Sequence, residues 1–328
     1  MSEIVFLDEA PETAVDVSVD PACFALRQAN FPDEIVFHAP GLRRYKTAEY
    51  GRHNPAEFVS ISLTGNACAL GCDHCGTLAL RGMADLRRFG GSLYDLCARL
   101  AERGARGVLI SGGSDRDGRV PLLPHIPDLI RVRRELGLKI RVHPGLPDEE
   151  TCAALAEVGI DGAMVDIIGH EDTIREVYHL AATPEDYEAL LARLETHGVP
   201  AVPHIILGLH YGRMLGEWRA LQMIGRHALK LLVLVVLTPW SGTAMVGVRP
   251  PPLAEIGDFF AAARRAMPET PIVLGCARPA GLVKREIDRL AVDAGLNGIA
   301  YPAEGIADYA RQRGLRPQFI NACCGVAW

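Results

Sequence analysis

Residues 68–75 read Cys68-Ala69-Leu70-Gly71-Cys72-Asp73-His74-Cys75 and place three cysteines at C-x3-C-x2-C spacing. A run that is typical of a β-strand, residues 58–63, comes shortly before them. A tight loop at the end of a strand can turn three thiolates toward one point, and thiolates are soft ligands that suit iron–sulfur clusters or zinc. The sequence therefore predicts a metal-binding loop whose ligands are Cys68, Cys72 and Cys75.

The number of cysteines in this loop bears on the kind of metal site. Structural zinc sites and electron-transfer clusters usually have four protein ligands, and no fourth cysteine follows nearby in the sequence. Three ligands leave one metal position open, which chemistry at a metal requires. The alternatives are a zinc loop with His74 as the fourth ligand and three incidental cysteines.

The composition bounds the class of protein and its surroundings. The chain has 328 residues, of which 49% are hydrophobic, so one large α/β domain with a sizeable core is possible. The net charge of −6 comes from charges of both signs scattered along the chain, which indicates neither nucleic acid nor a membrane surface as a partner. No signal peptide is recognisable at the start, and the apolar run 231–237 is far shorter than the about 20 residues of a membrane span. We therefore expect a cytoplasmic protein, in which clustered thiols indicate metal or redox chemistry more than disulfides.

Strand-like and helix-like runs alternate from residue 57 onward. Short apolar or β-branched runs predict the strands, and apolar spacings of three and four between them predict amphipathic helices. Eight βα units in roughly 250 residues match a (β/α)8 TIM-type barrel, whose active site lies at the carboxyl ends of the strands. An open doubly wound sheet is the alternative. The predicted strands are residues 58–63, 107–111, 139–143, 162–167, 201–208, 231–238, 271–274 and 298–301.

Two short segments flank the predicted barrel, which spans residues 56–301. Residues 1–55 are predicted to form an N-terminal extension, with a short helix near 21–28 and an extended segment at 31–41 that prolines interrupt. Residues 302–328 are predicted to form a C-terminal tail that covers the top of the barrel.

The cysteine loop resembles the signature of the radical S-adenosylmethionine (SAM) superfamily. This resemblance implies that Cys68, Cys72 and Cys75 hold a [4Fe-4S] cluster whose fourth iron binds the amino and carboxylate groups of SAM. It also implies that His74 lies near the SAM adenine, at a position where the family often has an aromatic residue.

Other stretches resemble the SAM-binding segments of this superfamily. Ser111-Gly112-Gly113-Ser114 follows the second predicted strand and resembles the Gly-Gly-Glu motif that receives the amino group of SAM, with Ser114 in place of the acid. Glycines at a strand end let the backbone approach a ligand closely. The resemblance implies further contacts from His143 and Asp166, at the ends of the third and fourth strands, and from Ile206 on the fifth. The alternative for His143 and Asp166 is that they are polar residues at the barrel rim that face water. The alternative for Ile206 is that it belongs to a buried strand.

The remaining cysteines divide into packing residues and a second candidate ligand set. Cys97 and Cys152 lie within helical patterns and are predicted to pack in the core. Four thiols then remain, the number that completes another cluster. We hypothesise an auxiliary [4Fe-4S] cluster held by the barrel-top cysteine and the tail pair, with the N-terminal cysteine or a non-cysteine group as the fourth ligand. These residues are Cys276, Cys323, Cys324 and Cys23.

A packed core thiol is the alternative for Cys276 and for Cys23. Arg278 follows Cys276 by two residues at the predicted barrel top. It is predicted either to bind a carboxylate through both of its terminal nitrogens or to cap the rim of the barrel.

Several softer motifs resemble the biotin and lipoyl synthase branch of the superfamily. They include Gly275-Cys276-Ala277-Arg278-Pro279, Glu286-Ile287-Asp288 and Ile299-Ala300-Tyr301-Pro302. Residues 31–42 and the Cys323-Cys324 pair resemble the two-component lipoyl synthases, in which two related radical SAM subunits share the reaction. The chain lacks the N-terminal C-x4-C-x5-C triplet of the single-chain lipoyl synthases.

This resemblance implies an enzyme that inserts sulfur into an octanoyl chain carried on a lysine of a lipoyl carrier protein. A 5′-deoxyadenosyl radical from SAM would abstract hydrogen from the chain, and the auxiliary cluster would donate the sulfur. The implied partners are the octanoylated lipoyl domain, a second radical SAM subunit and a reducing donor such as a ferredoxin. The alternatives are another radical SAM reaction, such as biotin-type sulfur insertion or a rearrangement, and a non-catalytic iron–sulfur protein.

Overall fold

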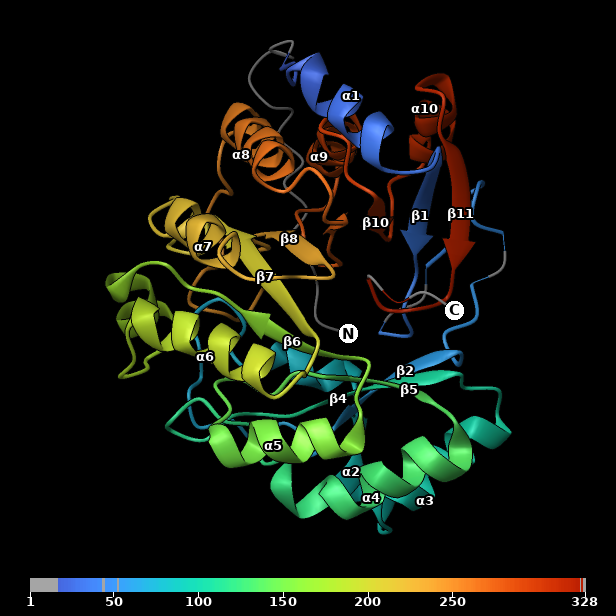
Figure 1. Ribbon diagram of the computed structural model, residues 1–328, viewed down its shortest axis with the longest axis vertical. Helices are drawn as coiled ribbons and strands as arrows, with labels where there is room; N and C mark the ends of the chain where they lie inside the picture. Colours follow the sequence, from blue (N-terminus) through green and yellow to red (C-terminus); the bar gives the residue numbers. More distant parts are fainter. Residues whose placement is uncertain (1–16, 43–44, 52, 325, 327–328) are drawn as a thin grey trace.

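The computed structural model describes residues 17–42, 45–51, 53–324 and 326. Within these ranges, eleven parallel strands form one sheet that curves around an interior, and helices pack on its outer side (Figure 1). The strands lie side by side in the order β11-β1-β10-β9-β8-β7-β6-β5-β4-β2-β3. Their bounds are β1 Glu34–His38, β2 Phe58–Ser62, β3 Ala84–Asp85, β4 Gly107–Ser111, β5 Lys139–Val142, β6 Gly162–Asp166, β7 Ala201–Leu207, β8 Leu232–Val236, β9 Ile272–Leu274, β10 Gly298–Ala300 and β11 Arg316–Ile320.

Helices alternate with most of these strands, which is the connection that parallel neighbours require. The α-helices are α1 Pro21–Asn30, α2 Leu86–Phe89, α3 Leu93–Glu102, α4 Ile126–Arg131, α5 Glu149–Val158, α6 Pro184–Thr196, α7 Glu217–Ile224, α8 Leu253–Ala266, α9 Leu282–Asp293 and α10 Ile306–Gln312. Short 3-10 turns cover Leu78–Gly82 and Leu123–His125, and π-helical turns cover Val132–Leu136 and Thr173–Val177. Local sequence sets their ends. In α6, for example, Thr183 and Asp186 form a capping box around Pro184.

The predicted TIM-type arrangement is confirmed. Each of the eight predicted strands is present, and they lie in chain order from β2 through β4 to β10. These strands are apolar on both faces because each face is covered. In β4, Val108 and Ile110 belong to the core under the helices, whereas Leu109 belongs to a second core inside the curved sheet.

The two flanking segments extend the sheet beyond the eight predicted strands of the barrel. The expected helix and extended segment of residues 1–55 are α1 and β1, and β1 pairs in parallel with both β10 and β11. Side-chain hydrogen bonds connect the β11 end of the sheet to the β2 side. Asn321, just after β11, donates to the Glu57 carboxylate at 3.0 Å and accepts from the Asn54 backbone N–H at 3.2 Å. The eight-strand barrel is thereby extended by its own flanking segments.

The interior of the curved sheet is filled by side chains from the strands and from the C-terminal tail. Phe58, Leu109, Met164 and Val233 are among the strand residues in this interior core. The tail adds its residues 322–324 and 326 to the same core. The tail therefore lies against the lumen side of the strands.

Two further predictions concern the ends of the chain and membranes. The predicted absence of a signal peptide rests on the first residues, and residues 1–16 lie outside the described part. Among the residues that the structure describes, none of the helices is both long enough and apolar enough to cross a membrane.

Candidate functional site

The three cysteines of the predicted metal-binding loop open onto one cavity at the carboxyl ends of the strands. Cys68, Cys72 and Cys75 are free thiols, and all three line a cavity of about 260 Å³. Cys72 is buried, and the other two are half-buried. The loop that carries them follows β2 directly, so the strand fixes where the loop begins.

Backbone hydrogen bonds and left-handed residues shape this loop. The Cys72 carbonyl accepts from the N–H groups of Cys75 and Gly76 at 3.1 and 2.8 Å, which coils the chain between the second and third cysteines. Gly71 and Gly76 have φ angles of +59° and +48°, a region that glycine enters without the usual steric cost. The coil turns Cys72 and Cys75 toward the same cavity.

Burial sets the chemical state of these thiols before any metal binds. Burial raises the pKa of Cys72 and of Cys75, and the neighbouring cysteines add to the effect. Both are therefore neutral thiols in the metal-free protein at pH 7. Metal binding must displace their protons, because the thiolate is the ligand.

The glycine loop after β4 lies directly against the cysteine loop. The Gly113 N–H donates to the Thr64 hydroxyl at 2.6 Å, and the Ala69 N–H donates to the Ser114 carbonyl at 2.8 Å. A Cβ atom at residue 113 would lie 1.9 Å from the Ala67 carbonyl oxygen, so only glycine fits there. Ser111, Gly112, Gly113 and Ser114 all line the same cavity.

Asp166, His143 and His74 complete the predicted set around this cavity. Asp166 accepts a hydrogen bond from the Tyr178 hydroxyl at 3.0 Å, which fixes the carboxylate at the end of β6. The His74 ring lies 5.0 Å from the Tyr178 ring, measured between centroids. Burial lowers the pKa of His74, and it lowers the pKa of His143 to about 4. Both imidazoles are therefore neutral at pH 7 and offer hydrogen bonds without adding charge.

Sequence reasoning missed two tyrosines in the wall of the cavity. Tyr178 and Tyr187 both line it. They lie in and just after the long connection that follows β6, where no strand end marks a residue as facing the site. No periodic pattern in the sequence marks Tyr178 as a residue that faces the site.

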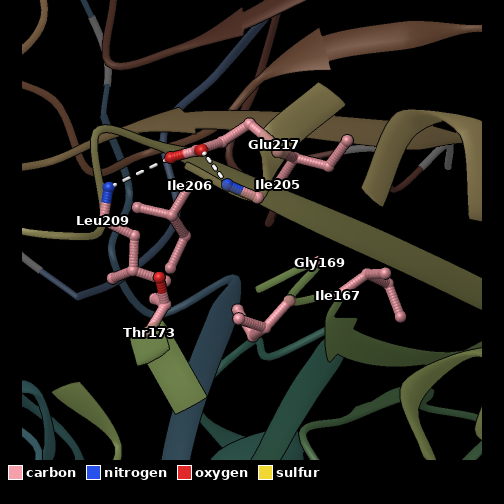
Figure 2. Close-up of a pocket in the computed structure, with 9 residues that line it drawn as sticks. Ile167, Gly169, Thr173, Ile205, Ile206, Leu209 and Glu217 are labelled. Atoms are coloured by element: carbon pink, nitrogen blue, oxygen red, sulfur yellow. Dashed lines mark hydrogen bonds between the residues drawn. The ribbon is translucent and has the colours of Figure 1, made fainter. Parts of the chain in front are cut away.

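Ile206 is a predicted cofactor contact that the structure places elsewhere. Figure 2 shows it beside a separate small pocket, together with Ile167, Thr173 and Leu209. That pocket measures about 10 Å³, room for at most a single water molecule. The chain turns away at Gly208, where Glu217 accepts hydrogen bonds from the backbone N–H groups of Gly208 and Leu209 at 2.9 and 3.2 Å. This position does not support a contact between Ile206 and a ligand of the cysteine cavity.

A second group of thiols lies inside the barrel. The Cys323 and Cys324 sulfurs are 4.0 Å apart, and Cys276 packs against the same interior core. The contact with Cys324 lowers the pKa of Cys323, and the Arg141 guanidinium acts in the same direction. One thiolate of this pair is therefore easier to form than an ordinary buried thiolate.

Cys23 does not join this group, which corrects the predicted ligand set. It lies on α1 and donates to the Ala261 carbonyl of α8 at 3.6 Å, while Arg265 approaches its sulfur at 3.4 Å. Helices α1 and α8 pack outside the sheet (Figure 1). The cysteine count had suggested a fourth ligand, but a count carries no information about which side of the sheet a residue occupies.

One residue of β6 belongs both to the wall of the cysteine cavity and to the interior core. Met164 on β6 lines the cysteine cavity, and it also packs in the interior core with Cys323 and Cys324. The cysteine cavity and the interior core therefore adjoin each other at Met164.

Three other predicted residues have structural roles. Cys97 and Cys152 are fully buried in α3 and α5, as expected for packing residues. Arg278 does bind a carboxylate, but that carboxylate is Asp288 of α9, and neither side chain is exposed. Arg278 is thus not available to a ligand of the cavity.

The loop suits a multi-iron cluster better than a single ion. Thiolates around one zinc ion lie about 3.8 Å apart, given Zn–S bonds of about 2.3 Å and tetrahedral geometry. In the described ranges, no group of three or more His, Cys, Asp or Glu side chains is arranged to hold a metal ion. A cubane cluster binds each thiolate to a different iron, so its ligands line a cavity, as Cys68, Cys72 and Cys75 do.

Comparison with known proteins agrees with this geometry. Residues 62–212 match the model of the Radical SAM superfamily, and this range contains the cysteine loop and the glycine loop. No curated protein matches the chain.

Solved structures share the fold at low sequence identity. Methylornithine synthase (PylB) is 14% identical with a TM-score of 0.61, and the match covers 90% of this chain and 87% of that one. The FeFe-hydrogenase maturase HydG from Carboxydothermus hydrogenoformans is 16% identical with a TM-score of 0.58, over 92% of this chain and 71% of that one. At such identities the likeness shows the fold alone, and neither of these two structures is a lipoyl or biotin synthase.

Proposed function

We propose that this chain is a radical SAM enzyme that cleaves SAM at the cysteine loop, and the match of residues 62–212 to the model of that superfamily supports this proposal. The observation that carries this proposal is the single cavity lined by both the cysteine loop and the glycine loop. Cys68, Cys72 and Cys75 would hold a [4Fe-4S] cluster with one iron left for SAM. When bound, that cluster supplies the electron that splits SAM into methionine and a 5′-deoxyadenosyl radical.

The chain's own residues bind and orient SAM in this proposal. The backbone at Gly112 and Gly113 receives the amino group, because the missing side chains leave the carbonyl groups accessible. Asp166, held by the Tyr178 hydroxyl, accepts a hydrogen bond from the ribose or the amino group. Neutral His74 lies beside the adenine. Bound SAM and substrate would have to displace water from the cavity, which protects a reactive radical from side reactions.

The finer proposal is sulfur insertion into an octanoyl chain on a lipoyl carrier protein. Cys276, Cys323 and Cys324 would hold an auxiliary [4Fe-4S] cluster, with a non-cysteine fourth ligand. That cluster supplies the sulfur. The support is that these thiols belong to the interior core, which adjoins the cysteine cavity at Met164. A second radical SAM subunit and a ferredoxin-like reductant are the proposed partners.

Iron and sulfide content after anaerobic reconstitution tests both levels of this proposal. We expect about eight irons in the wild type and about four in either the C68A/C72A/C75A or the C323A/C324A variant, at four irons per cubane cluster. The matched control is C97A/C152A, which also removes buried thiols and should keep about eight irons. About four irons in the wild type, unchanged in C323A/C324A, would remove the auxiliary cluster and with it the lipoyl assignment.

The substrate is tested directly with an octanoylated lipoyl domain. Wild-type protein, SAM and a reductant should yield methionine, 5′-deoxyadenosine and a carrier whose mass rises by one or two sulfur atoms. Formation of 5′-deoxyadenosine without a sulfur gain would point to a different radical SAM reaction. Failure to bind SAM at equilibrium would point to a non-catalytic iron–sulfur protein.

A further inference from the structure

Asp73, the residue that follows the second cysteine, receives contacts from two other loops. Its carboxylate accepts a hydrogen bond from the His179 ring at 2.9 Å and another from the Tyr211 hydroxyl. Each contact uses a different carboxylate oxygen. His179 comes from the connection after β6 and Tyr211 from the connection after β7, so three loops of the barrel top meet at this one carboxylate.

Both partners of Asp73 have unusual backbone conformations. His179 has a φ angle of +55° and Tyr211 a φ angle of +50°. Residues other than glycine are uncommon in this region, and asparagine, aspartate and histidine enter it more readily than the rest. The strain is therefore greater at Tyr211 than at His179, and such strain is of order 1–3 kcal/mol per residue. Such strain persists only where surrounding contacts determine the conformation. At both residues, the side chain that results points to Asp73.

The same segment makes further contacts with the cysteine loop. The Asp73 N–H donates to the Val177 carbonyl at 2.9 Å, and the Cys72 thiol approaches the Tyr178 carbonyl at 3.8 Å. The Tyr178 ring also lies against His74, the residue before Cys75. The connection after β6 therefore packs along the cysteine loop from Cys72 to His74.

A plain surface ion pair is the alternative reading of these contacts. Asp73 is 20% exposed and His179 is 44% exposed, and exposed ion pairs contribute about 0–1 kcal/mol. That reading does not account for two strained residues on separate loops that contact opposite oxygens of one carboxylate. Nor does it account for the place of that carboxylate, directly beside a metal ligand.

We propose that Asp73, His179 and Tyr211 form a clamp that holds the cysteine loop in the shape its cluster requires. They are positioning residues: they touch neither SAM nor iron, and they act through the backbone of Cys72. Groups that orient metal ligands typically change metal affinity by 10- to 100-fold when they are removed. The clamp rests on the proposed cluster at Cys68, Cys72 and Cys75.

Iron retention is the test. The reconstituted full-length protein is mixed anaerobically with an iron chelator, and the rate of iron release is followed by absorbance. We expect D73A to release iron about tenfold faster than wild type, and H179A and Y211F a few-fold faster. H179Q keeps an N–H donor for Asp73, so it should release iron more slowly than H179A, at a rate closer to that of the wild type. Y309F is the matched control, since it removes a tyrosine hydroxyl that donates to a different aspartate, Asp293.

Hydrogen exchange of the metal-free protein provides a readout that needs no cluster. In D73A, backbone amides of residues 69–78 should exchange faster, while amides of β4 to β7 keep their wild-type protection. Wild-type iron release together with wild-type exchange in D73A would overturn the clamp. A wild-type protein that binds no iron would instead overturn the proposed function, so the two failures are distinguishable.

Discussion

Gly113 is the residue at which the two loops of the site come closest. Its missing side chain leaves room for the Ala67 carbonyl and for the Cβ atom of Cys68, which a Cβ at residue 113 would approach to 1.9 and 2.5 Å. Both of these neighbours belong to the cysteine loop, and one of them is backbone. The glycine loop can lie this close to Cys68, the proposed first ligand, only because residue 113 has a hydrogen atom in place of a Cβ atom.

The G113A variant tests this close approach. The added methyl group must push the cysteine loop away from β4, and overpacking of this kind costs about 1–3 kcal/mol. We expect weaker SAM binding and a lower iron content, measured by equilibrium binding and by iron analysis. G51A is the control, because a Cβ at Gly51 meets no atom within 4 Å. Wild-type SAM affinity in G113A would show that the two loops can separate without cost.

The position of some site residues could be predicted from the sequence, and that of others could not. Cys68 and Gly113 follow neighbouring strands, and the carboxyl ends of neighbouring parallel strands meet, so their convergence could be predicted. Ile206 could not be placed, because periodicity tells which face of a strand a side chain occupies but not how far along the barrel it lies. Tyr178 could not be found either, since it lies in a connection without regular periodicity.

Helix α9 is attached to the sheet by a buried ion pair. Arg278, in the loop after β9, donates to both oxygens of Asp288 on α9, at 2.5 and 3.1 Å. The same guanidinium donates to the carbonyl groups of Gly275, Ala300 and Tyr301 at 2.8, 2.6 and 2.9 Å. One side chain thus joins the ends of β9 and β10 to the helix between them.

The D288N variant tests this attachment. It leaves the Arg278 cation buried without its counter-charge, a change that costs about 3–5 kcal/mol in buried pairs. We expect a loss of that order in the free energy of unfolding, measured with urea on the metal-free protein. D308N is the control, because Asp308 pairs with Arg311 at the surface, where the charge is exposed. A loss below 1 kcal/mol in D288N would mean that water reaches the Arg278 guanidinium.

Helices and strands could be predicted where their own residues show a periodic apolar pattern. The barrel strands from β2 to β10 are apolar runs between turn residues, and amphipathic spacing marks the helices. Strand β1 lies within the extended segment that the sequence predicted at 31–41, whereas β11 was missed for a physical reason. None of the residues of β11 is fully buried, so no apolar pattern marks it as a strand. Its partner β1 is also distant in the sequence: Arg316 of β11 contacts Glu34 of β1, 282 residues earlier. Only the assembled sheet makes β11 a strand.

The molecule as a whole carries buried neutral histidines, and these make its stability depend on pH. His204 on β7 is 6% exposed, and burial lowers its pKa to about 4. The ordinary pKa of histidine in an unfolded chain is about 6.5, so the unfolded state binds the proton more tightly. The stabilisation is complete above about pH 6.5 and is lost as the pH falls from there toward 4.

Unfolding with urea at several pH values tests this dependence. Between pH 7.5 and pH 4.5, His204 alone should remove up to about 3 kcal/mol from the free energy of unfolding of the metal-free protein. The H204Q variant, which cannot titrate, should lose less over the same range. Parallel pH profiles for the two proteins would mean that His204 keeps its ordinary pKa in the folded state.

The pairing of β1 with β10 and β11 also has a consequence for the order of events during synthesis. A ribosome releases β1 early, but the neighbours of β1 emerge only after most of the chain has been made. The cysteine loop and the walls of its cavity are complete once residue 187 has emerged, whereas Cys323 and Cys324 follow β11. The cysteine cavity can thus take shape on a nascent chain before the interior thiols reach their places.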